Sequence, residues 1–71
     1  MDPDALEAAR SHYNAAYAAY LERARRVAQK LENGLTPSVE EVMEEAKATE
    51  HLAAARRELL DAMAKMLPGR P

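Results

Sequence analysis

The amino-acid sequence predicts an all-α protein, an antiparallel two-helix hairpin of the coiled-coil kind that dimerises into a four-helix bundle. Apolar residues recur at alternating spacings of three and four along two segments of about 30 residues each, as in coiled-coil helices. One glycine-containing break separates these segments, and no stretch alternates with the period of two typical of a β-strand. Because the connection is short, the helices are expected to be antiparallel neighbours in a single domain. The expected bounds are a helix over 3–33, a turn over 34–36, a helix over 37–66 and a frayed tail over 67–71.

The first helix has signals at both of its ends. Asp2 can cap its N-terminus, and Pro3 suits the first helical position, where a missing N–H costs nothing. At the other end, Gly34 can take the left-handed conformation that closes a helix, and Leu35 can pack back on the last turn.

The second helix has two competing start signals. Thr36 can act as N-cap with Pro37 at the first helical position, which repeats the pattern of the first helix. Ser38 with Glu41 three residues later forms a capping box, which would move the start by two residues. The tail contains proline and glycine, which cannot continue the helical pattern.

A narrow apolar stripe on the first helix is predicted to pack against a matching stripe on the second. All three tyrosines of the chain fall on it, and we expect their rings to be buried there rather than to form a stacking surface. Ala9 and Ala16 flank the stripe on one side, and Leu21 and Ala28 flank it on the other, so that another helix could approach closely. The predicted hairpin seam consists of Leu6, Tyr13, Tyr17, Tyr20, Val27 and Leu31 on the first helix and of Val42 and Leu60 on the second.

The second helix carries an additional apolar stripe, roughly 100° around its axis from the first. One partner helix cannot cover both stripes, so the additional one is predicted to bind a partner protein. Its methionines could adapt to a partner surface, although ordinary core filling would explain them as well. The predicted partner-binding residues are Leu52, Ala55, Leu59, Ala62, Met63 and Met66.

The charges are nearly balanced, with 12 acidic and 10 basic residues and a formal net charge of −2. Folding the hairpin at Leu35 places residue i roughly opposite residue 70 − i, so a basic cluster would lie beside an acidic run. We therefore interpret the cations as paired surface charges that fix the register. The alternative is an RNA- or DNA-binding face on a four-helix bundle. The cluster is Arg23, Arg25, Arg26 and Lys30, and the run is Glu40, Glu41, Glu44 and Glu45.

No pattern in the sequence indicates an enzyme, a cofactor or a metal site. The chain has no cysteine, and neither His12 nor His51 has a glutamate three residues before it, as a di-iron bundle site would require. Two glycines are too few for a phosphate-binding loop. No run is long and apolar enough to span a membrane, and the acidic start differs from a signal peptide, so a cytoplasmic location is expected.

The expected function is therefore that of a small non-enzymatic protein-interaction module: an adaptor, co-chaperone or regulatory subunit. It would act by forming a homodimer or by docking on a larger protein. In length and topology the chain resembles helical hairpins that dimerise into four-helix bundles, such as the plasmid-copy-control RNA-binding proteins, and two-helix co-chaperones of type III secretion needle subunits. This resemblance implies an interaction role but assigns no functional residue, because fold alone does not determine function.

Overall fold

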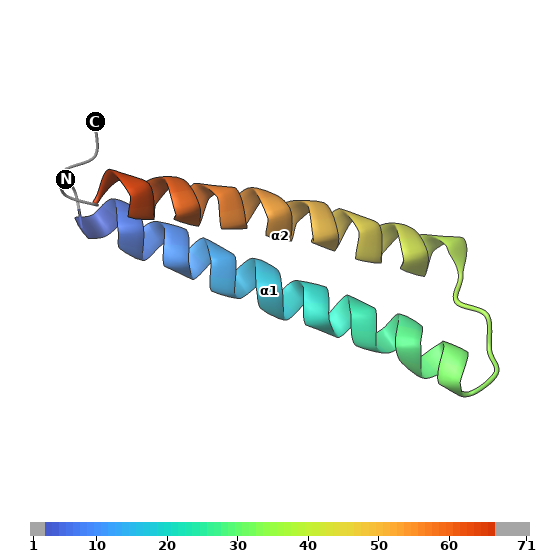
Figure 1. Cartoon of the computed structure of the whole chain (residues 1–71). Coiled ribbons are helices and arrows are strands. Elements are labelled where there is room, and N and C mark those ends of the chain that lie inside the picture. Colours follow the sequence, from blue (N-terminus) through green and yellow to red (C-terminus); the bar gives the residue numbers. More distant parts are fainter. Residues whose placement is uncertain (1–2, 67–71) are drawn as a thin grey trace.

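A computed structural model describes residues 3–66 of the chain as two antiparallel helices that lie side by side (Figure 1). Helix α1 is Pro3–Glu32 and helix α2 is Val39–Lys65. All regular secondary structure within these described residues is helical, which confirms the expected all-α hairpin. The molecule is a rod of 53 × 20 × 17 Å. The expected Asp2 cap and the expected tail over 67–71 lie outside the described residues.

Helix α1 ends in a Schellman motif centred on Gly34. The glycine has a φ of +76°, and its N–H donates to the carbonyl oxygen of Leu31 over 3.1 Å. The N–H of Leu35 donates to the carbonyl oxygen of Lys30 over 2.7 Å. These two bonds satisfy carbonyl groups that the end of a helix otherwise leaves free, and only glycine takes this backbone conformation at little cost.

Helix α2 begins with a reciprocal capping box. The Oγ of Ser38 accepts a hydrogen bond from the N–H of Glu41 over 3.1 Å, and the Oε1 of Glu41 accepts one from the N–H of Ser38 over 2.8 Å. The helix therefore starts at Val39, two residues beyond the start expected at Pro37. Two reciprocal bonds satisfy more free N–H groups than a single cap at Thr36 could.

A line of shielded residues runs along each helix and marks the hairpin seam, where the two helices touch. The most buried are three alanines, Ala9 at 0% exposure, Ala55 at 7% and Ala48 at 8%. Within the described residues only the opposite helix can cover them, and alanine lets two helix backbones approach closely. Larger side chains, themselves half-buried, alternate with the alanines at spacings of three and four. In α1 the apolar seam residues are Leu6, Ala9, Tyr13, Ala16, Tyr20 and Val27; in α2 they are Ala48, Leu52, Ala55, Leu59 and Ala62. Toward the turn the same line continues with half-buried charged side chains, Arg23 and Lys30 in α1 and Glu41 and Glu45 in α2.

Three polar side-chain contacts across the seam fix how the helices are aligned. The Nδ1 of His12 lies 3.2 Å from the Oε2 of Glu58, and the Nζ of Lys30 lies 2.7 Å from the Oε1 of Glu41. The Nη1 of Arg23 lies 3.1 Å from the Oε1 of Glu44. The residue numbers in these pairs add to 70, 71 and 67, which confirms the expected register of i opposite 70 − i.

The predicted rotation of α2 about its axis is wrong. Two predicted seam residues of this helix are exposed, Val42 at 46% and Leu60 at 57%. On α1, Tyr17 at 45% and Leu31 at 60% also lie outside the contact line. The seam instead uses the stripe of α2 that was predicted to bind a partner, so four of those partner-binding assignments are corrected. The reason is that close packing selects alanine, whereas the prediction gave more weight to large apolar side chains. The four residues that move into the seam are Leu52, Ala55, Leu59 and Ala62.

Candidate protein interface

The two sides of the hairpin, to either side of the seam, have different compositions. In each helix the residue after a seam position is rotated by about 100° around the helix axis. Because the helices run in opposite directions, these rotations turn the following residues of both helices toward the same side of the hairpin. The residues that precede seam positions lie together on the other side.

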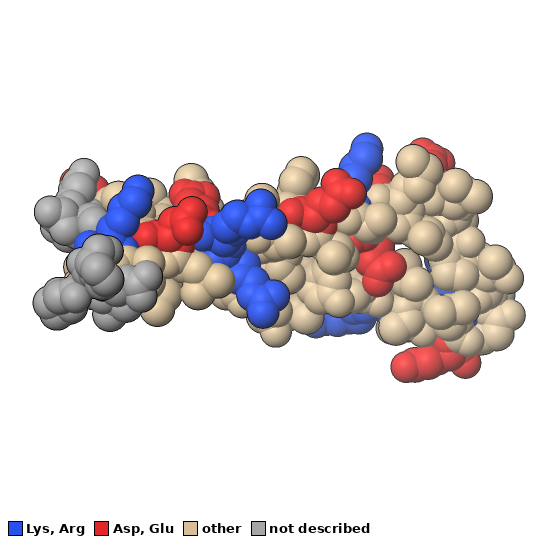
Figure 2. Space-filling view, turned by 45° about the horizontal axis from the view of Figure 1, so that its top comes forward, with Lys and Arg blue, Asp and Glu red and all other residues tan. Residues whose placement is uncertain are grey.

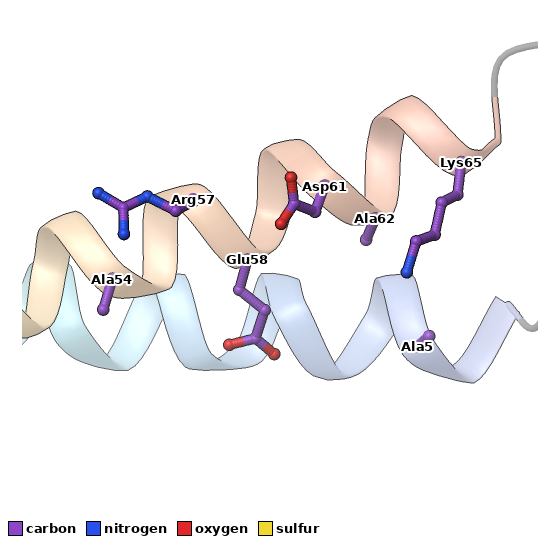
Figure 3. A pocket seen from close by; sticks show the side chains of 7 residues that line it. All are labelled: Ala5, Ala54, Arg57, Glu58, Asp61, Ala62 and Lys65. Carbon is purple, nitrogen blue, oxygen red and sulfur yellow. The ribbon is translucent and has the colours of Figure 1, made fainter. Parts of the chain in front are cut away.

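The side that precedes the seam is polar, and we call it the ion-pair face. It carries the pairs of His12 with Glu58 and of Arg23 with Glu44, both of which bridge the helices. A shallow hollow on this face is lined by alanine and charged residues, and Figure 3 shows Glu58 and Lys65 extending from α2 toward α1 there. Polar and charged side chains thus bridge the two helices on this side.

The side that follows the seam is largely uncharged and uncovered, and we call it the apolar face. Its large side chains are exposed to an unusual degree, with Val39 at 75%. A soluble monomer rarely leaves a continuous apolar surface of this kind open to water, so such a surface indicates an interaction site. The apolar face comprises Tyr17, Leu21, Ala24, Ala28 and Leu31 of α1 and Val39, Val42, Ala46, Ala53, Leu60 and Met63 of α2.

Among the described residues, charges occur on the apolar face only near the open end of the hairpin, where α1 begins and α2 ends. Glu7 and Arg10 are there on α1, where they form an ion pair of 3.5 Å, and Arg56 is there on α2. Among the described residues Arg56 has no ion-pair partner, and it lines a small hollow with Leu60. From Tyr17 to the turn the face has no charged residue. Figure 2 likewise shows the turn end mostly in tan, with few charged side chains.

The basic cluster is not a free cationic surface. Arg23 and Lys30 are paired with glutamates of α2, and Arg26 lies 3.6 Å from Glu22 one turn earlier in α1. Within the part of the chain that the structure describes, only Arg25 of this cluster lacks an ion-pair partner. Paired cations bind phosphates poorly, so the arrangement does not favour the RNA- or DNA-binding alternative.

The carboxylate of Glu41 has the most perturbed environment of the described carboxylates. The hydrogen bond from Lys30, followed by the backbone N–H of Ser38, lowers the pKa of Glu41 from 4.5 to about 2. Both groups stabilise the charged form of the carboxylate. Because Glu41 caps α2 and Lys30 belongs to the last turn of α1, this cluster joins the two helix ends beside the turn, and its role is structural.

The described residues offer no cluster suited to metal binding. No three of their histidine, aspartate or glutamate side chains are grouped to hold a metal ion. His12 is exposed and contacts Glu58 alone among the described charged groups. Within the same range, no helix is long and apolar enough to cross a membrane.

The chain exposes more surface than a compact protein of its size. Its accessible surface is 5650 Å², whereas about 4,400 Å² is typical of a folded monomer of 7.9 kDa. The radius of gyration is 16.2 Å, whereas about 11 Å is typical of a compact domain of this length. The whole chain therefore exposes roughly 1,200 Å² more surface than is usual for its mass.

Comparisons with known proteins give no match: no protein-family model, no curated protein and no solved structure resembles this chain closely enough. The function must therefore be argued from the hairpin itself.

Sequence reasoning missed most of the apolar face as an interface. Of the residues predicted to bind a partner, only Met63 lies on it, and Met66, which is 43% exposed, follows the last turn of α2. The available signal was the recurrence of alanine every seven residues, at Ala9 and Ala16 and again at 48, 55 and 62. Residues at this spacing form the line of closest approach between the helices. Once that line is known, the residues that follow it identify the apolar face.

Proposed function

We propose that the protein is a non-enzymatic protein-interaction module that acts by self-association. Two copies would pack their apolar faces together and form a four-helix bundle. The ion-pair faces would then point outward, where their charged side chains stay hydrated. The apolar face replaces the stripe that the sequence predicted to bind a partner.

The observation that carries this proposal is the excess of uncovered surface. A standard protein interface buries about 800 Å² on each partner. The excess of roughly 1,200 Å² per chain is large enough to supply an interface of that size. A second copy also offers a face of the same length and composition, as the two-fold symmetry of most homodimers requires.

Light scattering coupled to size exclusion tests the proposal on the purified chain. We expect a dimer at micromolar concentration and a melting temperature that rises with protein concentration, because association stabilises the folded state by mass action. A monodisperse monomer with a concentration-independent melt would contradict self-association. Docking on a larger protein would then be the remaining interaction role.

Two alanine variants of α2 show whether the apolar face is responsible. Ala46→Glu places a charge in the middle of this face and should produce helical monomers, because burying the carboxylate between two copies is costly. Ala54→Glu places the same charge on the ion-pair face and should leave the dimer intact. Both alanines are exposed in the hairpin, so neither change disturbs the seam. Equal effects of the two changes would contradict the assignment of the interface.

A further inference from the structure

The apolar face is not uniform along its length, and this constrains how a second copy can lie on it. Between the turn and Tyr17 the face carries only apolar side chains and Thr49. Between Asn14 and the open end it carries Glu7, Arg10 and Arg56. The half near the turn therefore has fewer charged side chains to desolvate than the half near the open end.

Two symmetric arrangements of a face-to-face dimer are available, and they differ in which helices meet. If both turns lie at the same end, α1 packs against α2 of the partner subunit. If the turns lie at opposite ends, α1 packs against α1 of the partner subunit, and α2 against its α2. Both arrangements keep all neighbouring helices antiparallel, so helix dipoles do not distinguish them.

The charges on the half of the apolar face near the open end do distinguish the two arrangements. With the turns at the same end, both copies of Arg10 and Arg56 fall at one level of the bundle, so four cations face only two copies of Glu7. Like charges brought together in a partly desolvated interface repel strongly. With the turns at opposite ends, the cations of the two copies are separated by most of the length of the rod.

We infer that two hairpins associate with their turns at opposite ends and centre their contact on the halves near the turn. This inference rests on the proposed self-association. The two-fold axis then passes beside Ala24 and Ala46, which lie opposite each other in the hairpin register because 24 and 46 add to 70. These small side chains are at the middle of the uncharged half and allow close approach of the two copies.

Residues at equal distances from the two-fold axis meet across it. Tyr17 lies seven residues before Ala24 and therefore packs against Leu31 of the partner subunit, seven residues after it. Ala53 of α2 meets Val39 of the partner subunit in the same way. Arg56 lies ten residues after Ala46 and therefore falls beside the partner's turn.

Single cysteine variants test the arrangement cleanly, because the chain contains no cysteine of its own. Ala24→Cys should form a disulfide dimer on mild oxidation, or a covalent dimer with a short bismaleimide, because the two copies of this residue face each other. Ala46→Cys should behave in the same way. Ala18→Cys is the matched control in α1, since Ala18 is exposed on the outer side of the helix, and it should remain uncrosslinked.

Mixing the two variants separates this inference from the proposed self-association. If the turns lie at the same end, the single variants stay uncrosslinked and only the mixture of Ala24→Cys with Ala46→Cys gives a covalent dimer. That result would overturn the arrangement but leave self-association standing. A chain that is dimeric by light scattering but forms no covalent dimer in either experiment would also overturn the arrangement. The same holds if Ala18→Cys crosslinks as readily as Ala24→Cys or Ala46→Cys. A monomer in every experiment would overturn both proposals.

Discussion

Tyr13 and Tyr17 stack one helical turn apart, with ring centroids separated by 6.1 Å and planes inclined by 9°. The two rings nevertheless differ in environment, because Tyr13 is half-buried in the seam and Tyr17 is 45% exposed. This stack links the hairpin seam to the apolar face. A single aromatic cluster therefore spans both the seam and the exposed apolar face.

Truncating the tyrosines should separate these two contributions. Tyr20→Ala removes a half-buried ring from the seam and should lower the free energy of unfolding by about 3 kcal/mol. Tyr17→Ala should lower the free energy of unfolding clearly less than this in a dilute, monomeric sample, but it should weaken dimerisation. Denaturant titrations at low and high protein concentration measure both effects. A larger loss for Tyr17→Ala in the dilute sample would place this ring in the seam after all.

Two adjacent leucines of α2 provide a matched test of the helix rotation. Leu59→Glu should unfold the hairpin, because it introduces a carboxylate into the seam without a partner. Leu60→Glu changes a side chain that is 57% exposed and should leave the hairpin helical. Circular dichroism of the two variants compares them directly. Similar helix content in both would show that α2 is rotated differently.

Close packing at the alanines can be tested by enlarging a side chain, whereas the tyrosine variants remove one. Ala55 is 7% exposed, so Ala55→Leu should force the helices apart and cost about 1–3 kcal/mol. Ala54→Leu, at the neighbouring exposed position, should change the free energy of unfolding by less than about 0.5 kcal/mol. Thermal melts measured at one concentration compare the two variants. A stabilising effect of Ala55→Leu would mean that the seam has unfilled space.

The capping carboxylate predicts a specific response to acid. Because folding lowers the pKa of Glu41 from 4.5 to about 2, its contribution to stability is present above pH 4.5 and is lost as the pH falls toward 2. Glu41→Gln retains an acceptor for the N–H of Ser38 but cannot titrate. The variant should therefore lose less stability than the unaltered chain over this range.

Denaturant titrations on both sides of that pH range measure the effect. Lys30→Gln removes the larger cause of the lowered pKa and should give an intermediate response. If Glu41→Gln and the unaltered chain lost the same stability on acidification, Glu41 would not be ionised preferentially in the folded state.

Much of the fold could be predicted from local signals in the sequence. Gly34 predicted how α1 ends, and the spacing of opposite charges predicted the register that Lys30 and Glu41 now mark. Such features depend on residues that are close in sequence or on charges that must pair across two helices. They can therefore be recognised from the order of the residues alone.

The rotation of α2 could not be predicted by the same means, because both of its stripes are apolar and either could face α1. The choice depends on how closely two backbones approach, and this is a property of the pair of helices. Buried alanine contributes little apolar area by itself, yet Ala48 and Ala55 determine the approach, while Val42 and Leu60 remain outside. The functional assignment followed the same error, since the predicted interface became the seam.

The turn between the helices also determines the order in which contacts can form. Lys30 and Glu41 are 11 residues apart in the chain, whereas His12 and Glu58 are 46 apart. Closing a short loop costs less entropy, so the two helices should pair progressively from the turn toward the open end. Gly34→Ala should accordingly slow folding, whereas changes around His12 should mainly accelerate unfolding, as stopped-flow measurements can show. The open end is then the part of the rod that separates most often, and the part from which proteases would gain access.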